Sequence, residues 1–94
     1  MKSLPHIIRA STGQDILRCQ GCFDCDINTS NEGDIPLGAL VQLAIMDDEE
    51  ALLSRTLWSE PVLQASRGAC KLGINLHTVL LALRDEAIKR NVFR

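Results

Sequence analysis

Hydrophobic residues recur at helical spacing along most of the chain beyond residue 34. The first run predicts a helix over residues 37–46, and Asp34, two residues before Pro36, is typical of its cap region. The last run predicts the longest helix, over about residues 76–91, with Asn75 as its N-cap. A continuous apolar stripe indicates that this last helix packs on a core: Leu76, Val79, Leu80, Leu83, Ala87 and Ile88.

Two shorter helices are predicted between these runs. Asp47 or Asp48 is placed to cap the first of them, and the acidic run 47–50 is expected to be its solvated start. Residues 59–61, Ser-Glu-Pro, are typical of the start of the second helix, and Gly68 of its end. Cys70 then lies in a turn between two glycines.

The first eighteen residues show only isolated apolar pairs, Ile7-Ile8 and Ile16-Leu17, separated by a turn at residues 11–13. We expect mostly coil there, with at most a short strand or helical turn. No strand pattern competes beyond residue 34. The sequence therefore predicts one all-α domain over residues 1–94, with four or five short helices around a cysteine loop.

Composition narrows the class of function. The 94 residues carry a formal net charge of -2 and are only 3% aromatic, which disfavours nucleic-acid binding because that needs a basic face and stacking rings. No apolar run is long enough to cross a membrane, and the N-terminus lacks the apolar core of a secretory signal, so a cytoplasmic protein is expected. A chain this short builds a modest core, which a metal or covalent cross-link would reinforce.

Four cysteines are the strongest chemical signal: Cys19, Cys22, Cys25 and Cys70. Disulfides are disfavoured in a reducing compartment, and a thioredoxin-type pair needs a βαβ context that is absent from the pattern. Zinc usually takes two ligands from each of two Cys-x-x-Cys pairs, whereas three ligands from one loop and one from far away are typical of a [4Fe–4S] cluster. One [4Fe–4S] cluster is the favoured interpretation, zinc is the second, and cysteines that pair on oxidation are the third.

Along the chain, the cysteine loop is followed by the helix over residues 37–46, an acidic short helix, Leu57-Trp58, a segment that ends in Cys70, and the stretch from Asn75 to Arg84. This order resembles that of the small iron–sulfur subunit of heterodisulfide reductase and its relatives, over roughly residues 14–93. The resemblance implies an α-helical ferredoxin, similar in fold to the helical half of the iron–sulfur subunit of succinate dehydrogenase and fumarate reductase.

Members of that family carry two runs of Cys-x-x-Cys-x-x-Cys-x-x-x-Cys-Pro and hold two [4Fe–4S] clusters, the fourth cysteine of each run serving the other cluster. The slots of the first run fall here on Cys19, Cys22, Cys25 and Thr29. The slots of the second run fall on Glu60, Leu63, Ser66 and Cys70.

The four cysteines that remain form one complete ligand set under this crossed rule, and the other set is lost entirely. Random loss of four slots in eight leaves a complete set in only about two of seventy arrangements. The resemblance therefore implies one cluster on Cys19, Cys22, Cys25 and Cys70, and Leu63 indicates that the space of the second became hydrophobic core.

The expected function is that of an electron-transfer or docking subunit, not an enzyme, working with redox partner proteins of a heterodisulfide-reductase-like complex. The alternative is a non-redox module in which a structural cluster or zinc ion on the same cysteines shapes a protein-interaction surface or senses oxidant. Trp58 is expected to pack against the core, and His6 and His77 to be no ligands. Part of the last helix's stripe also fits a partner or homo-oligomer surface.

Overall fold

The structure, a computed structural model, describes residues 3–19 and 34–92, which form helices and connecting turns without any strand. The all-α prediction is confirmed for this part of the chain. The predicted number of four or five helices is too low, because these residues alone form six α-helices and one short 3₁₀ helix. In chain order they are α1 (Leu4–Thr12), η1 (Ile16–Arg18), α2 (Leu37–Ile45), α3 (Glu50–Leu53), α4 (Arg55–Trp58), α5 (Glu60–Ala65) and α6 (Leu76–Lys89).

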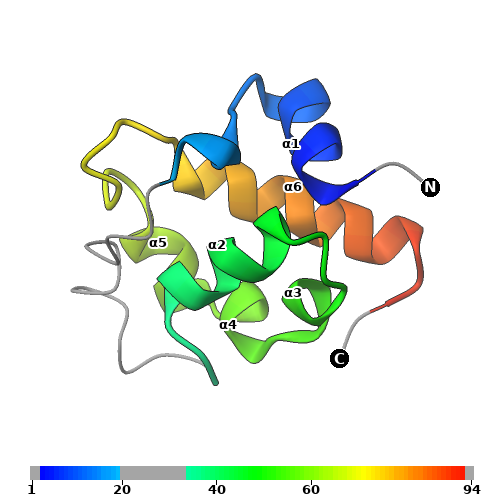
Figure 1. Ribbon diagram of the computed structural model, residues 1–94. Coiled ribbons are helices and arrows are strands. Elements are labelled where there is room, and N and C mark those ends of the chain that lie inside the picture. The colour runs from blue at the N-terminus through cyan, green and yellow to red at the C-terminus, as the bar shows by residue number, and fades with distance from the viewer. Residues whose placement is uncertain (1–2, 20–33, 93–94) are drawn as a thin grey trace.

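Helix α6 is the centre of the packing. Helix α1 lies on one side of it and α2 to α5 lie on the other (Figure 1), and α6 contacts α1, α3, α4 and α5 directly. Asn75 caps it as predicted, because its side-chain oxygen accepts the Thr78 N–H at 3.3 Å. Five of the six predicted stripe residues are buried: Leu76, Val79, Leu80, Leu83 and Ala87.

The prediction that Ile88, the sixth residue of the stripe, packs in the core is wrong. Its side chain is 60% exposed. It lies one turn beyond the half-buried Arg84, at the edge of the stripe and in the last turn of α6, which ends at Lys89. A position at the edge of a helical stripe faces the core only where a neighbouring helix extends far enough to cover it.

The prediction of coil at the N-terminus is also wrong, because residues 4–12 form helix α1. The Ser3 hydroxyl accepts the His6 N–H at 3.4 Å, and Pro5 lies in the first turn, where its missing N–H is not needed. Gly13, at φ 75°, ends the helix in the left-handed conformation. Leu4 and Ile8, one turn apart, are fully buried against the core.

Asp34 does not cap α2, contrary to the prediction. The residue at that cap is Pro36, and no side chain bonds to the helix start. The Asp34 carboxylate instead accepts the Ser54 hydroxyl at 2.6 Å and the Thr56 backbone N–H at 3.3 Å. The bond from Ser54 is the main cause that holds the pKa of Asp34 well below its usual value, because it stabilises the charged form more than burial disfavours it.

Three short helices, not two, fill the stretch between α2 and α6. The prediction that Asp47 or Asp48 caps the first of them is wrong, because the N-cap of α3 is Glu49 and no side chain caps the helix; the Asp48 carboxylate accepts the Glu50 N–H at 3.0 Å from one residue before that cap. Ser54, with φ -66° and ψ 135°, separates α3 from α4 and caps α4 through the Thr56 N–H. Ser59 caps α5 as predicted, but that helix ends at Ala65 with Ser66 as its C-cap, earlier than the predicted end at Gly68, which has φ 68° in the following turn.

Trp58 packs against the core, as predicted, although it remains half-buried. Its indole N–H donates to the Leu52 carbonyl at 3.1 Å, which joins α4 to α3. The Arg84 guanidinium carbon lies 5.7 Å from the centre of the indole ring, a cation–π distance, and its Nε donates to the Leu57 carbonyl at 2.7 Å. This arginine therefore fastens α6 to α4.

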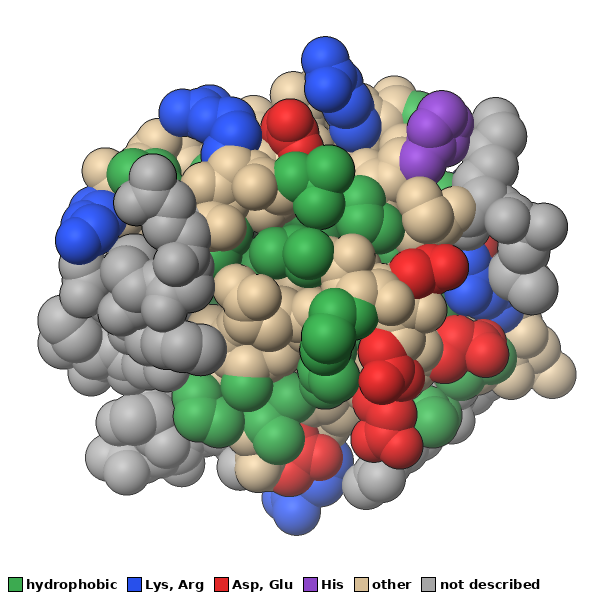
Figure 2. All heavy atoms as spheres, viewed as in Figure 1, with side chains coloured by type: hydrophobic (Ala, Val, Ile, Leu, Met, Phe, Trp, Pro, Cys, Tyr) green, Lys and Arg blue, Asp and Glu red, His purple; other side chains and the backbone are tan. Residues whose placement is uncertain are grey.

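Acidic side chains gather on the surface near the α2–α3 junction (Figure 2), where residues 47–50 are exposed or half-buried. One of them has a structural role, because the Asp47 carboxylate accepts the Leu4 N–H of α1 at 2.9 Å. Among the residues that the structure describes, four large apolar side chains are exposed, namely Leu17, Met46, Leu81 and Ile88. Within the described part of the chain, no helix has the length and apolar character needed to span a membrane.

Candidate metal centre

Two of the four predicted ligands lie within the described residues. Cys19 directly follows η1 and is half-buried, and its backbone N–H bonds to the Ile16 carbonyl at 3.0 Å. Cys70 is half-buried in the turn between α5 and α6. No disulfide joins these two cysteines to each other. Cys22 and Cys25 lie outside the described residues, so their role stays a prediction.

The segment before Cys19 is bonded directly to the turn that contains Cys70. The guanidinium of Arg18 donates to the Leu72 carbonyl at 3.2 Å, across 54 positions of sequence. The side-chain oxygen of Gln14 accepts the Asn75 N–H at 3.0 Å, across 61 positions. The fold thus joins the residues just before Cys19 to the segment that carries Cys70.

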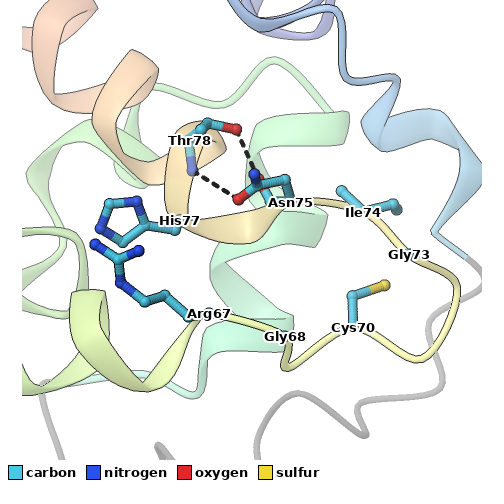
Figure 3. Close-up of a pocket in the computed structure, with 8 residues that line it drawn as sticks. All are labelled: Arg67, Gly68, Cys70, Gly73, Ile74, Asn75, His77 and Thr78. Carbon is cyan, nitrogen blue, oxygen red and sulfur yellow. Dashed lines mark hydrogen bonds between the residues drawn. The ribbon is translucent and has the colours of Figure 1, made fainter.

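The turn around Cys70 owes its shape to two glycines. Gly68 and Gly73 have φ values of 68° and 84°, a conformation that side chains with a Cβ rarely adopt. The Gly73 N–H bonds to the Cys70 carbonyl at 3.1 Å and closes the turn. In Figure 3 the Cys70 side chain lies on the inner side of this turn.

A pocket of about 400 Å³ opens beside Cys70. Its lining includes Arg67 and His77, which lie at the end away from Gly73 (Figure 3). The start of α6 lines it too, and there Thr78 donates two hydrogen bonds to Asn75, from its N–H to the side-chain oxygen and from its hydroxyl to the carbonyl, so the cap is satisfied within the chain. His77 therefore faces the pocket rather than lying in the core.

Gln42 makes the most informative polar contact to a predicted ligand. Its side-chain Nε2 donates to the Cys19 Sγ at 3.4 Å. The packing of α2 against η1 brings Gln42 next to Cys19, which directly follows η1. Sequence reasoning missed this residue, although one signal was present: Gln42 is the one polar side chain in the nine-residue helix α2.

The slots where the resemblance expects further cysteines hold residues with structural roles. Glu60 is paired with Arg84 at 3.1 Å on the surface, and Leu63 is only 6% exposed within the hydrophobic core. The Ser66 hydroxyl is fully buried and donates to the Leu63 carbonyl at 2.6 Å. Thr29 lies outside the described residues. Leu63 is thus part of the core, whereas the loss of a second cluster from this place stays a prediction.

Among residues 3–19 and 34–92, no three His, Cys, Asp or Glu side chains come together in a way that holds a metal ion. Half of the predicted ligand set lies outside those residues. Against known proteins, the chain matches no family model, no curated protein and no solved structure.

Proposed function

We propose that this chain is an α-helical ferredoxin that holds one [4Fe–4S] cluster on Cys19, Cys22, Cys25 and Cys70. It serves as an electron-transfer or docking subunit of a heterodisulfide-reductase-like complex. The cluster changes its oxidation state by one electron, and the protein supplies four thiolates and the surroundings that adjust the potential. This one-electron role needs no acid, base or nucleophile from the chain.

The observation that carries the proposal is the pair of bonds between the two cysteine-bearing segments. Arg18 reaches the Leu72 carbonyl and Gln14 reaches the Asn75 N–H, so both segments are held together by contacts that involve no cysteine. A ligand set divided three plus one needs this meeting of distant segments. The described half of the donor set also fits a thiolate centre, because Cys19 and Cys70 are both half-buried and the Cys19 sulfur accepts an N–H bond.

A single cluster changes what the subunit does compared with two-cluster relatives. Two centres in series conduct an electron through a subunit, whereas one centre accepts an electron from one partner protein and passes it to another over a shorter path. The replacement of the second set by Leu63 in the core and by the Glu60–Arg84 ion pair favours this single-centre role.

The metal content of the full chain tests the proposal. Protein isolated or reconstituted without oxygen is expected to hold four iron atoms and four sulfides per chain, and its broad absorption near 400 nm is expected to bleach with dithionite. Colourless protein with one zinc ion per chain contradicts the redox function and supports the structural alternative on the same cysteines.

The ligand assignment has its own test. Cys70→Ser is expected to lose the four-iron cluster or to change its spectrum, because an alcohol is a poor replacement for a thiolate ligand. Ala69→Ser is the matched control, since it introduces the same side chain at the half-buried neighbouring position of the same turn. A Cys70→Ser protein that keeps the cluster with the wild-type spectrum shows that Cys70 is not the fourth ligand.

A further inference from the structure

Helix α2 contributes one polar side chain to the surroundings of the predicted ligands. The Nε2 of Gln42 lies 3.4 Å from the Sγ of Cys19, and both side chains are half-buried. We infer that Gln42 is a positioning residue, which holds the Cys19 sulfur by an N–H···S bond and raises the reduction potential of the cluster. The inference rests on the proposed function.

The placement of Gln42 in an apolar helix supports a specific role. Its neighbours on α2 include Val41 and Ala44, which are buried in the core. Moving an amide group from water to the edge of a core costs free energy unless the group finds a hydrogen-bond partner. The Cys19 sulfur provides that partner, so the amide and the sulfur orient one another.

The direction of the effect follows from charge. A thiolate ligand carries negative charge, and adding one electron to the cluster increases the negative charge on all of its sulfurs. A hydrogen-bond donor aimed at one sulfur stabilises the reduced state more than the oxidised state. The amide of Gln42 therefore raises the potential, and its loss lowers it.

The test is a redox titration of the reconstituted full-length protein, followed by visible absorption. Gln42→Met keeps the length of the side chain but removes the donor, and its potential is expected to fall. A tenfold weaker reduction equilibrium corresponds to about 59 mV for one electron, and the expected fall is up to about that size. Gln64→Met is the matched control, because it makes the same change at an exposed position of α5 and is expected to leave the potential unchanged.

A second variant keeps the test decisive if Gln42→Met does not hold the cluster. Gln42→Glu retains the shape but presents a carboxylate instead of an N–H donor, so its potential is expected to fall further. Wild-type potentials in the cluster-loaded Gln42 variants overturn this inference and leave the proposed function intact. A wild-type protein that takes up no cluster overturns the proposed function, and the inference falls with it.

Discussion

At the scale of single residues, Asp34 is the clearest case of a side chain whose charge is fixed by its neighbours. The hydroxyl of Ser54 and the backbone N–H of Thr56 both donate to its carboxylate, although the Asp34 residue itself is exposed. Ser54 and Thr56 are buried, and the Ser54 hydroxyl has the Asp34 carboxylate as its acceptor. Asp34 thereby connects the chain before α2 to the junction of α3 and α4.

Asp34→Asn is expected to lower the free energy of unfolding at pH 7 by about 1 kcal/mol, a value reduced for the exposure of the site. Because the pKa of Asp34 is lower in the folded state, its stabilising contribution is complete above the usual value of 3.8 and is lost as the pH falls below it. Urea unfolding at pH 7 and at pH 3 measures the difference between wild type and variant, which is expected to shrink in acid.

Asp85→Asn provides the control for that pH effect. Asp85 pairs with Lys89 on the surface of α6, with both side chains more than half exposed, and exposed pairs of this kind add little stability. If the free energies of unfolding of wild type and Asp34→Asn differ equally at both pH values, the role of the Asp34 charge is contradicted.

At the scale of elements, helix α1 depends on a distant residue for its start. The carboxylate of Asp47 accepts the Leu4 N–H, and the two residues lie 43 positions apart. Asp47 has φ 57°, a left-handed conformation that Asp and Asn tolerate better than residues with apolar side chains. The end of α2 and the start of α1 are therefore coupled through one residue.

Asp47→Ala is expected to destabilise the protein by about 1–2 kcal/mol, because it removes the acceptor at α1 and places alanine in the left-handed conformation. Asp47→Asn keeps an oxygen acceptor and the favoured backbone, so it is expected to cost less than half as much. Denaturant midpoints measure both effects. Equal losses of stability in the two variants contradict the role of Asp47 at the start of α1.

Local signals explain which elements were predictable. Ser59 and Asn75 act on the backbone within a few residues, and both begin their helices as predicted. Asp34 and Asp47 bond to partners 20 and 43 positions away, and the helical spacing of hydrophobic residues does not identify such distant partners. Helix α1 was predictable from Ser3, Pro5 and Gly13, but its apolar residues read as isolated pairs.

The same division holds for the candidate site. The spacing of the cysteines predicts the ligand set, but the neighbours of that set depend on tertiary packing. The contact from Gln42 to Cys19 spans 23 positions and follows from the packing of α2 against η1. A polar residue in an apolar helix marks such a contact but does not identify its partner.

At the scale of the whole molecule, the two cysteine-bearing segments lie on either side of α2 to α5 in the sequence. A metal centre on Cys19, Cys22, Cys25 and Cys70 closes this stretch into a loop. Such a cross-link removes freedom from the unfolded chain, and binding of the metal is coupled to folding. The proposed cluster is therefore expected to stabilise the fold in addition to the proposed redox role.

Removal of the metal is expected to lower the melting temperature by at least about 10 °C, since each kcal/mol shifts a domain of this size by several degrees. Circular dichroism of loaded and metal-free protein under anaerobic conditions measures the change. The metal-free wild type and Cys70→Ser are expected to melt at similar temperatures, because both lack the connection. Equal melting of the loaded and metal-free forms contradicts the structural role.

The contact of Trp58 with Arg84 has a practical consequence. The chain has one tryptophan and no tyrosine, so nearly all of its intrinsic fluorescence comes from the place where α4 meets α6. The indole is half-buried and bonded to the Leu52 carbonyl, and it passes into water when these helices separate. Emission from this one ring therefore reports the opening of the helical core without any added label.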